Sequence, residues 1–222
     1  MTTWLFDLDN TLHNATAAIF PHINRLMTRY MAHTLQTSEQ QASELRIKYW
    51  HQYGATLLGL VRHHDIEAHH FLRATHEFDN LAAMIEAERG LAWALRRLPG
   101  RKILLTNAPE RYARQVLFHL GLQTHFHACY AIEHMQVRGR FLPKPSRTML
   151  AHVLAREKLK PHQCLLVEDT VMNLKSAKSL GLRTIWVTGW GHATKKTVGC
   201  PQGVDMKVQS VTQLPRAIAR LL

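Results

Sequence analysis

The sequence predicts an α/β protein in which a parallel β-sheet lies between two layers of helices and a helical domain is inserted. A short apolar run, Trp4–Phe6, predicts a buried strand that is followed at once by acidic residues. Residues 15–98 contain almost no strand signal, whereas from Arg101 onward apolar strand-like runs alternate with helical patterns. Because such alternation produces parallel sheets with right-handed crossovers, we expect a Rossmann-like three-layer core and an inserted helical domain.

The helical insertion is expected to begin soon after the first strand. From residue 15 onward, apolar residues recur at three- and four-residue spacing, which predicts an amphipathic helix. Ser38 followed by Gln41 resembles a capping box that opens a second helix. Pro99-Gly100 is a strong breaker that ends the helical region. The expected domains are a core of residues 1–14 and 99–222 and a helical domain of residues 15–98.

After residue 100 the expected elements alternate regularly. Pro109 suits the first turn of a helix, and Gly121 and Gly181 are expected to end helices. The segment 133–143, with Arg138-Gly139-Arg140, is expected to be a loop. The expected strands are 102–106, 129–132, 163–167, 183–188 and 204–208, with helices following residues 109, 144, 170 and 213 and a glycine-rich loop running up to Gly203.

The composition is that of an ordinary globular protein. Of the 222 residues, 46% are hydrophobic and 20% are charged, which disfavours disorder, and no run approaches the ~18 apolar residues of a membrane span. Asp7 and Asp9 interrupt the N-terminal apolar run, so a signal segment is not expected. The scattered Cys129, Cys164 and Cys200 form no C-x-x-C pair, which favours a reducing, cytoplasmic location.

The charge balance is strongly basic. The chain has 28 Lys and Arg against 16 Asp and Glu, a net charge of +12 that attracts anions. These basic residues are spread along the chain, without a long basic tract, an RNA-binding signature or a zinc finger. We therefore interpret the charge as favouring small phosphorylated substrates over nucleic acid as the main ligand.

Polar side chains follow three predicted strands at their carboxyl ends, where open parallel sheets bind ligands. Asp7 and Asp9 are two residues apart and share one face if the strand continues. Close carboxylates repel, and a cation with oxygen ligands, such as Mg²⁺, relieves that repulsion. Each residue alone also fits a cap or a solvated charge, but together they indicate metal-assisted phosphoryl transfer. The set is Asp7, Asp9, Thr106, Asn107, Lys144, Glu168 and Asp169.

This set resembles the haloacid dehalogenase superfamily of phosphatases. The residues that match its four motifs, in order and spacing, are Asp7-x-Asp9-x-Thr11, Thr106-Asn107, Lys144-Pro145 and Glu168-Asp169-Thr170 with Asn173. The resemblance covers essentially the whole chain. Asp7 and Thr106 are 99 positions apart, a spacing similar to that of the subclass with a helical cap inserted after the first motif.

The resemblance implies a two-step mechanism that uses the first motif. Asp7 is expected to attack phosphorus and form an aspartyl-phosphate, a known role of carboxylates. Asp9 is expected to protonate the leaving alkoxide and later to activate water. A neutral residue at position 9 would suit a dehalogenase, so Asp9 favours phosphate chemistry.

The resemblance also implies the ligands of metal and phosphate. Magnesium (Mg²⁺) is expected to be held by Asp7, the backbone carbonyl of Asp9 and Asp169, with Glu168 close or bound through water. The metal and Lys144 are expected to neutralise charge on the phosphoryl oxygens. In addition, the Thr106 hydroxyl and the Asn107 backbone N–H are expected to bind phosphate oxygens near a helix N-terminus.

One segment of the expected insertion, residues 49–61, resembles the pyrimidine 5′-nucleotidase branch of the superfamily. Trp50 and Tyr53 are candidates for stacking on a base, although aromatic residues at helical spacing are more often core residues. The pairs His63-His64 and His69-His70 raise the alternative of a second metal site. Their spacing is not diagnostic without a matched carboxylate or cysteine, so we interpret them as surface histidines.

These inferences lead to one main hypothesis and its alternatives. We expect a Mg²⁺-dependent phosphomonoester hydrolase that acts through an aspartyl-phosphate, with nucleoside monophosphates as the expected substrates. A sugar-phosphate phosphatase or a phosphomutase would use the same fold, because fold does not fix function. A basic nucleic-acid-binding protein without turnover is the alternative from a different class.

Overall fold

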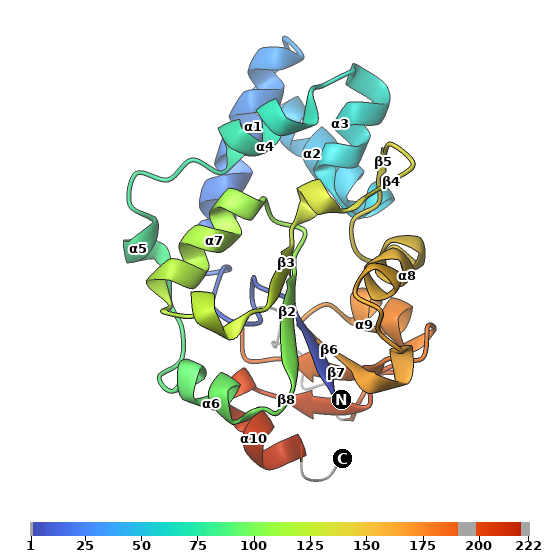
Figure 1. The fold of residues 1–222 in the computed structure, drawn as a ribbon. Coiled ribbons are helices and arrows are strands. Elements are labelled where there is room, and N and C mark those ends of the chain that lie inside the picture. The colour runs from blue at the N-terminus through green and yellow to red at the C-terminus, as the bar shows by residue number, and fades with distance from the viewer. Residues whose placement is uncertain (1, 191–198, 219–222) are drawn as a thin grey trace. The chain divides into compact units, whose positions relative to one another are not determined.

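The computed structural model describes residues 2–190 and 199–218. In this part of the chain, six parallel strands form one sheet in the order β3-β2-β1-β6-β7-β8, and two antiparallel strands, β4 and β5, form a hairpin (Figure 1). The strands are β1 (Thr3–Phe6), β2 (Arg101–Leu105), β3 (Ala128–Tyr130), β4 (Gln136–Val137), β5 (Arg140–Phe141), β6 (Cys164–Glu168), β7 (Arg183–Val187) and β8 (Met206–Val208).

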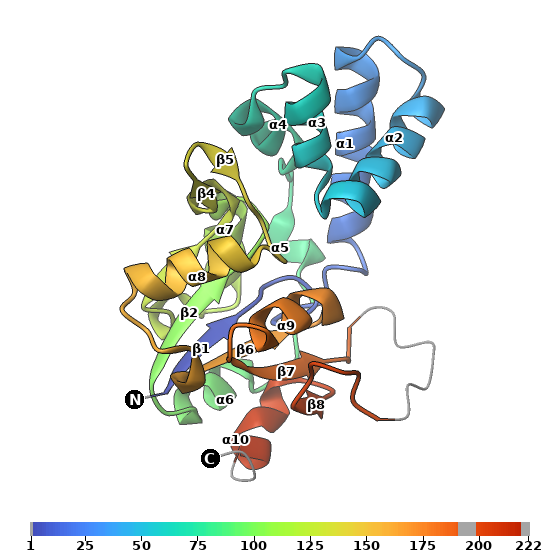
Figure 2. The same cartoon turned by 90° about the vertical axis from the view of Figure 1, so that its right-hand side faces the viewer.

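Helices cover both faces of the large sheet, which confirms the expected three-layer α/β core. Helices α8 and α9 lie on one face, and α6, α7 and α10 lie on the other (Figures 1 and 2). The helices of the core are α6 (Leu91–Arg97), α7 (Glu110–His119), α8 (Arg147–Arg156), α9 (Val171–Lys178) and α10 (Leu214–Ala217), with short 3₁₀ helices η1 (Gln123–His125), η2 (Ile132–His134), η3 (Pro161–Gln163) and η4 (Val211–Gln213).

The central strands are buried on both faces because helices cover the sheet from both sides. Every residue of β1 and β6 is buried, as expected for the middle of a parallel sheet. Trp4 is fully buried, stacks on Phe6 and donates a hydrogen bond from its indole N–H to the Pro99 carbonyl at 2.8 Å. This bond ties the start of β1 to the turn that precedes β2.

The chain divides into two compact units. The core unit comprises Met1–Thr16 and Ile85–Leu222, and the insertion unit comprises Ala17–Met84. The insertion unit is entirely helical, as the absence of strand signal predicts. Its helices are α1 (Ile19–Thr34), α2 (Glu39–Tyr53), α3 (Thr56–His64), α4 (Ala68–Thr75) and α5 (Leu81–Met84).

Local sequence signals explain how α2 begins, ends and packs. The expected capping box is confirmed, since the Ser38 hydroxyl accepts from the Gln41 N–H and the Gln41 side chain accepts from the Ser38 N–H. Gly54 ends the helix with φ at 80°, a left-handed conformation that favours glycine. A side chain at position 59 would collide with the Tyr49 ring, because its Cβ would lie 2.1 Å from Tyr49 Cγ. Glycine at 59 therefore allows α2 and α3 to approach closely.

The first helix begins later than its apolar periodicity predicts, at Ile19 instead of residue 15. Asn10 Oδ1 accepts hydrogen bonds from the backbone N–H groups of Ala15 and Thr16, both at 3.1 Å, so these residues are held in a turn. Pro21 then falls in the first turn of α1, where its missing N–H costs no helical hydrogen bond.

The segment 85–98, which we expected in the insertion, groups with the core unit. Helix α6 packs against α10 and η4, and the Thr212 hydroxyl donates to Glu88 at 2.8 Å. Asn14 also binds Glu86 through both its backbone N–H, at 2.7 Å, and its side-chain amide, at 2.9 Å. Periodicity alone did not separate α6 from the insertion because both regions are helical.

The expected loop at 133–143 contains secondary structure, so this part of the prediction is wrong. Strands β4 and β5 form a hairpin around Arg138 and Gly139, which have φ angles of 53° and 74°. Positive φ at both central residues is the geometry of a tight hairpin turn, in which asparagine or aspartate usually precedes glycine. Arginine at the first position hides that signal in the sequence.

Two further predictions concern the C-terminal part of the chain. The expected strand 204–208 is shorter, since β8 begins at Met206. Much of the expected glycine-rich loop up to Gly203 falls on residues 191–198 and lies outside the described residues. Among the helices that the structure describes, none has the length and apolar character needed to cross a membrane.

Candidate active site

The candidate site lies where the order of strands reverses, at the carboxyl ends of three neighbouring strands. Strand β1 runs between β2 and β6, and Phe6 is in register with Leu104 and Val167. Asp7 therefore leaves the sheet beside the end of β6, and its N–H donates to the Val167 carbonyl at 3.0 Å. Ligands bind at such switch points in open α/β sheets. Parallel register thus brings together the strand-end residues that the sequence singles out.

Lys144 joins two of these acids although it comes from a different segment. Its Nζ lies 2.5 Å from Asp7 Oδ1 and 2.8 Å from Glu168 Oε2, and all three residues are buried. The other Asp7 oxygen, Oδ2, accepts a hydrogen bond from the Thr11 hydroxyl at 3.0 Å. Both oxygens of Asp7 are therefore fixed by neighbouring donors.

Asn107 holds the main chain of Lys144 in place. Its side-chain amide donates to the Lys144 carbonyl at 3.0 Å, and the Lys144 N–H donates to Asn107 Oδ1 at 2.9 Å. The Lys144–Pro145 peptide bond is cis, and the Pro145 carbonyl accepts a hydrogen bond from the Ser176 hydroxyl at 2.5 Å. The sequence suggests a phosphate-binding backbone N–H at Asn107, and the structure adds a side chain that orients the lysine.

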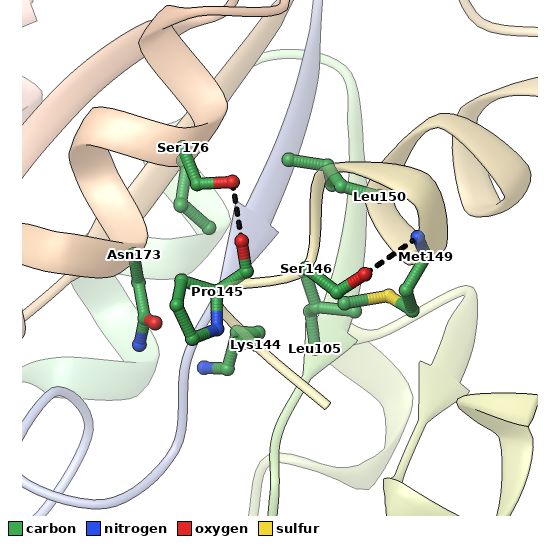
Figure 3. A pocket seen from close by; sticks show the side chains of 9 residues that line it. Leu105, Lys144, Pro145, Ser146, Met149, Leu150, Asn173 and Ser176 are labelled. Atoms are coloured by element: carbon green, nitrogen blue, oxygen red, sulfur yellow. Dashed lines mark hydrogen bonds between the residues drawn. The ribbon is translucent and has the colours of Figure 1, made fainter. Parts of the chain in front are cut away.

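A small pocket beside Lys144 is lined mainly by apolar atoms (Figure 3). Leu105 and Met149 contribute apolar side chains, and Asn173 and Ser176 project from α9. Asn173 is the residue that completes the fourth motif in the sequence. The apolar lining limits water around the stem of Lys144, which strengthens the attraction between its ammonium and the two carboxylates.

Burial and crowding set the protonation of this cluster. Burial, together with the charge of Glu168, raises the pKa of Asp7 to about 7 in spite of the attraction to Lys144. Burial also raises the pKa of Glu168 to about 7, with Lys144 opposing and Asp169 adding to the shift. For Lys144, burial lowers the pKa, but the attraction of Asp7 and Glu168 outweighs it and the pKa rises. Ionisation of both carboxyl groups would leave one negative charge that Lys144 does not neutralise.

Asp169 completes an acidic cluster with Asp7 and Glu168. One carboxylate oxygen from each of the three lies within 4.8 Å of the others. Burial, followed by the charge of Asp7, raises the pKa of Asp169. The Trp186 indole N–H donates to the Asp169 carbonyl at 2.8 Å and so anchors this residue. Three hard oxygen donors with unbalanced negative charge fit a divalent cation such as Mg²⁺.

Within residues 2–190 and 199–218, this is the one cluster of three or more His, Cys, Asp or Glu side chains with ligand-like spacing. The histidine pairs of the insertion unit have other partners. His63 and His64 contact the hydroxyls of Tyr53 and Tyr49, at 2.6 and 2.7 Å. His70 contacts the Tyr30 hydroxyl at 2.8 Å. These contacts give no support to a second metal site.

Asp9 is held by two residues that sequence reasoning missed, His13 and Tyr112. Its Oδ1 lies 3.0 Å from His13 Nε2 and accepts a hydrogen bond from the Tyr112 hydroxyl at 2.6 Å. Asp9 and His13 are four residues apart, but residues 10–12 form a turn and not a helix, so helical spacing does not predict their contact. Tyr112, 103 positions away on α7, is not recognisable from spacing.

Thr106 is buried directly after β2 and shapes the next turn. Its hydroxyl oxygen accepts a hydrogen bond from the Ala108 N–H at 3.0 Å, which leaves the hydroxyl hydrogen available for donation. Helix α7 begins four residues after Thr106, at Glu110. This placement is compatible with the predicted phosphate contact near a helix N-terminus.

Trp50 and Tyr53 both belong to α2 of the insertion unit. Trp50 is 55% exposed, so it is not the core residue that helical spacing usually indicates. Tyr53 is partly buried, bonds to His63 and lies under the Arg62 guanidinium, whose Cζ is 5.8 Å from the ring centroid. A stacking role for either residue stays a prediction.

Comparison with known proteins identifies the family. Residues 4–187 match the family model of haloacid dehalogenase-like hydrolases, so the chain belongs to that family. A phosphoglycolate phosphatase of Chromobacterium violaceum is 31% identical over 54% of this chain and 50% of its own length. The phosphoglycolate phosphatase of Pseudomonas putida is 24% identical over 85% of this chain and 70% of its own. The chain thus spans 50% and 70% of the lengths of these two curated relatives.

The fold is likewise that of known family structures. The crystal structure of a phosphatase of this family from Thermococcus onnurineus superposes with a TM-score of 0.67. It is 16% identical, and the match covers 98% of each chain. At this identity the likeness shows the fold alone, and it agrees with the expected class. The comparisons give no support to the more specific resemblance to pyrimidine 5′-nucleotidases.

Proposed function

We propose that this protein is a Mg²⁺-dependent phosphomonoester hydrolase in which Asp7 is the nucleophile. The observation that carries the proposal is the fixed Asp7 carboxylate, which bonds to Lys144 and Thr11 at the edge of an acidic cluster. A carboxylate held between two donors is oriented for in-line attack on phosphorus. The names of the two phosphatase relatives support the same reaction class.

The proposed first step transfers the phosphoryl group to Asp7. An Asp7 oxygen forms a bond to phosphorus while the ester P–O bond breaks, and the released electron pair goes to the leaving oxygen. Asp9 donates its proton to that oxygen, which avoids release of a basic alkoxide. The product alcohol then departs and an aspartyl-phosphate remains.

The second step returns the enzyme to its starting state. A water oxygen bonds to phosphorus, and Asp9, now a carboxylate, takes the proton from that water. The bond from phosphorus to Asp7 breaks, its electron pair returns to the carboxylate, and inorganic phosphate leaves. Asp9 thus acts first as acid and then as base.

Lys144 and a cation held by the acidic cluster would neutralise negative charge on the phosphoryl group of the substrate. Asp7, Asp169, Glu168 and the Asp9 carbonyl are the groups that would hold Mg²⁺. When bound, the cation supplies positive charge next to the transferring phosphoryl oxygens. The Lys144 ammonium reduces repulsion between Asp7 and the incoming dianion, and Thr106 and the Asn107 N–H would bind phosphate oxygens.

We propose small phosphorylated metabolites as the substrate class. Two relatives are named phosphoglycolate phosphatases, which supports a small sugar-like or carboxylate-bearing monoester over the nucleoside monophosphates first expected. Base recognition by Trp50 and Tyr53 would be required only for a nucleotide. The scattered free cysteines Cys129, Cys164 and Cys200 support the proposed cytoplasmic location.

A substrate panel tests this proposal. Hydrolysis of 4-nitrophenyl phosphate should require Mg²⁺ and should vanish in chelator. Sugar phosphates, phosphoglycolate and nucleoside monophosphates, compared by kcat/KM, then rank the substrate classes. A phosphomutase would instead form a phosphorylated isomer, and a nucleic-acid binder would retard DNA with a steep salt dependence. Absence of Mg²⁺-dependent phosphate release from the whole panel would contradict the proposal.

A further inference from the structure

We propose that His13 and Tyr112 are positioning residues that fix one oxygen of Asp9, so that the other oxygen, Oδ2, carries the proton in both catalytic steps. This inference rests on the proposed function and extends it to two residues outside the four motifs. Tyr112 lies on α7, and His13 lies in the turn that follows β1. Both therefore reach Asp9 from the framework of the core unit.

The two residues contact the same atom. The Tyr112 hydroxyl donates to Asp9 Oδ1 at 2.6 Å, and His13 Nε2 lies 3.0 Å from that oxygen. In the part of the chain that the structure describes, Asp9 Oδ2 accepts no hydrogen bond from the protein. The two oxygens of one carboxylate are thus unequal, with Oδ1 held by two groups and Oδ2 left for an external partner.

The burial of these groups fixes the direction of their hydrogen bonds. His13 is 0% exposed, and its Nδ1 is buried without a hydrogen-bond partner among the described residues. With the ring proton on Nε2, His13 donates to Asp9 and only the acceptor Nδ1 is unpaired. Tyr112 is also buried, and its hydroxyl is the donor in the 2.6 Å hydrogen bond to Asp9 Oδ1. Both residues therefore donate to the same carboxylate oxygen.

This arrangement serves Asp9 in both of its protonation states. When Asp9 is a carboxylic acid, Oδ1 is the carbonyl oxygen and accepts two hydrogen bonds, while Oδ2–H donates to the leaving oxygen. When Asp9 is a carboxylate, Oδ1 keeps the same donors and Oδ2 is the more basic oxygen, which takes the proton from water. The side chain therefore does not need to rotate between the two steps, and the proton returns to the atom it left.

The exchange of roles also explains why polar residues occupy these buried positions. Leucine and phenylalanine would fill the same space without leaving His13 Nδ1 unpaired, and replacing both partners of a buried hydrogen bond by apolar groups is often nearly neutral for stability. We therefore attribute the polar side chains of His13 and Tyr112 to their contact with Asp9, whose side chain is 16% exposed and so accessible to substrate. A positioning role predicts an effect on proton donation and not on phosphate binding.

The leaving group provides the experiment. 4-Nitrophenolate leaves without much help from an acid, whereas the phenolate of phenyl phosphate is more basic and depends on proton donation. In Tyr112→Phe we expect kcat/KM to fall about tenfold for phenyl phosphate and less than about threefold for 4-nitrophenyl phosphate. His13→Leu should show the same pattern, and His13→Gln, whose amide can donate in place of Nε2, should restore most of the loss.

Tyr130→Phe is the matched control. Its hydroxyl also donates to a carboxylate at 2.6 Å, but the acceptor is Glu157, away from the candidate site. This variant should hydrolyse both substrates at wild-type rates. Circular dichroism melts of all variants compare their folding.

The kinetic results distinguish a failure of the positioning role from a failure of the proposed phosphatase function. Equal losses for the two substrates in Tyr112→Phe and in His13→Leu, or no loss in either variant, would overturn the positioning role while the wild type remains a phosphatase. Failure of His13→Gln to exceed His13→Leu would overturn the role of His13 as a donor. A wild type that releases neither leaving group would overturn the proposed function and the positioning role together.

Discussion

The core unit and the insertion unit differ sharply in charge, although they belong to one chain. The core unit holds 22 Lys and Arg against 10 Asp and Glu, and so accounts for the entire net charge of +12. The insertion unit holds six of each and is formally neutral, while it contains eight of the 16 histidines. The attraction for anions therefore belongs to the unit that carries the acidic cluster and Lys144.

The two units also use polar side chains differently. In the core unit, the buried polar groups bond to one another around Asp7, as in the Lys144 and Thr11 contacts. In the insertion unit, tyrosine hydroxyls pair with histidines near the surface, as in Tyr53 with His63. We propose that the core unit carries out phosphoryl transfer and that the insertion unit influences which substrates are preferred.

The largest expected effect belongs to Asp7. Asp7→Asn removes the proposed nucleophile, so kcat for 4-nitrophenyl phosphate should fall by on the order of 10⁴-fold or more. The matched control is Asp79→Asn, which alters an exposed aspartate of the insertion unit and should leave kcat unchanged. Steady-state kinetics with Mg²⁺ measure both. Equal kcat for the two variants would remove the functional contrast between the units.

Asp9 should have the next largest effect. Asp9→Asn removes the acid and base, so turnover should slow by roughly 10²–10⁴-fold while the substrate still binds. The kcat measured at saturating substrate, with product inhibition by phosphate as a measure of binding, checks this prediction. Near-wild-type turnover would exclude Asp9 from proton transfer.

Lys144 contributes to stability as well as to charge balance. Lys144→Met leaves Asp7 and Glu168 buried without their cation, and breaking such a pair typically costs about 3–5 kcal/mol. Urea unfolding in chelator measures this loss. Arg73→Met in the insertion unit breaks an exposed 4.0 Å pair with Glu67 and should leave the free energy of unfolding almost unchanged. A similar cost for both would mean that the core cluster is not the buried ion pair described above.

Replacement of Trp50 tests whether the insertion unit influences substrate preference. Because Trp50 is largely exposed, Trp50→Ala should change the free energy of unfolding by less than about 0.5 kcal/mol. Activity on 4-nitrophenyl phosphate should stay within about threefold of wild type, while the ranking of natural substrates changes. A large loss of activity on every substrate would mean that Trp50 takes part in phosphoryl transfer. The two units would then not differ in function as proposed.

The smallest expected effect is a pH dependence far from the candidate site. The Tyr130 hydroxyl and then Arg101 stabilise ionised Glu157 and lower its pKa. The stabilisation is therefore present above the ordinary glutamate pKa of about 4.5 and is lost as pH falls through the lowered value. Glu157→Gln should be less stable than wild type at pH near 7, and denaturant unfolding should show the difference disappearing in acid. A stability difference between Glu157→Gln and wild type that stays constant from neutral to acidic pH would contradict this prediction.

The sequence alone predicts the features that depend on hydrophobic periodicity and on the residues at strand ends. Asp7, Glu168 and Asp169 follow buried apolar runs, and parallel pairing forces the ends of such runs to one edge. Lys144 was recognised through its place among the motifs. The orientation of Lys144 by the Asn107 side chain was not predicted, because a hydrogen bond between residues 37 positions apart leaves no periodic trace.

Other features depended on tertiary packing. Tyr112 appears in the sequence as one more apolar position of α7, and only folding brings its hydroxyl to Asp9. The assignment of 85–98 to the core depends on contacts of α6 with α10, which lie more than 100 positions along the chain. The hairpin at Arg138 required a left-handed arginine, a conformation that residue type does not signal.

The proposed mechanism requires that Asp7 itself becomes phosphorylated during turnover. Rapid acid quench of wild type reacting with 4-nitrophenyl phosphate and Mg²⁺, followed by mass spectrometry of peptides, tests it directly. We predict a gain of one phosphoryl group on the peptide that contains Asp7, which survives the brief acid quench and is lost in base, and no such gain in Asp7→Asn. Turnover without this adduct, or with the phosphoryl group on another residue such as His13, would contradict the role of Asp7 as nucleophile.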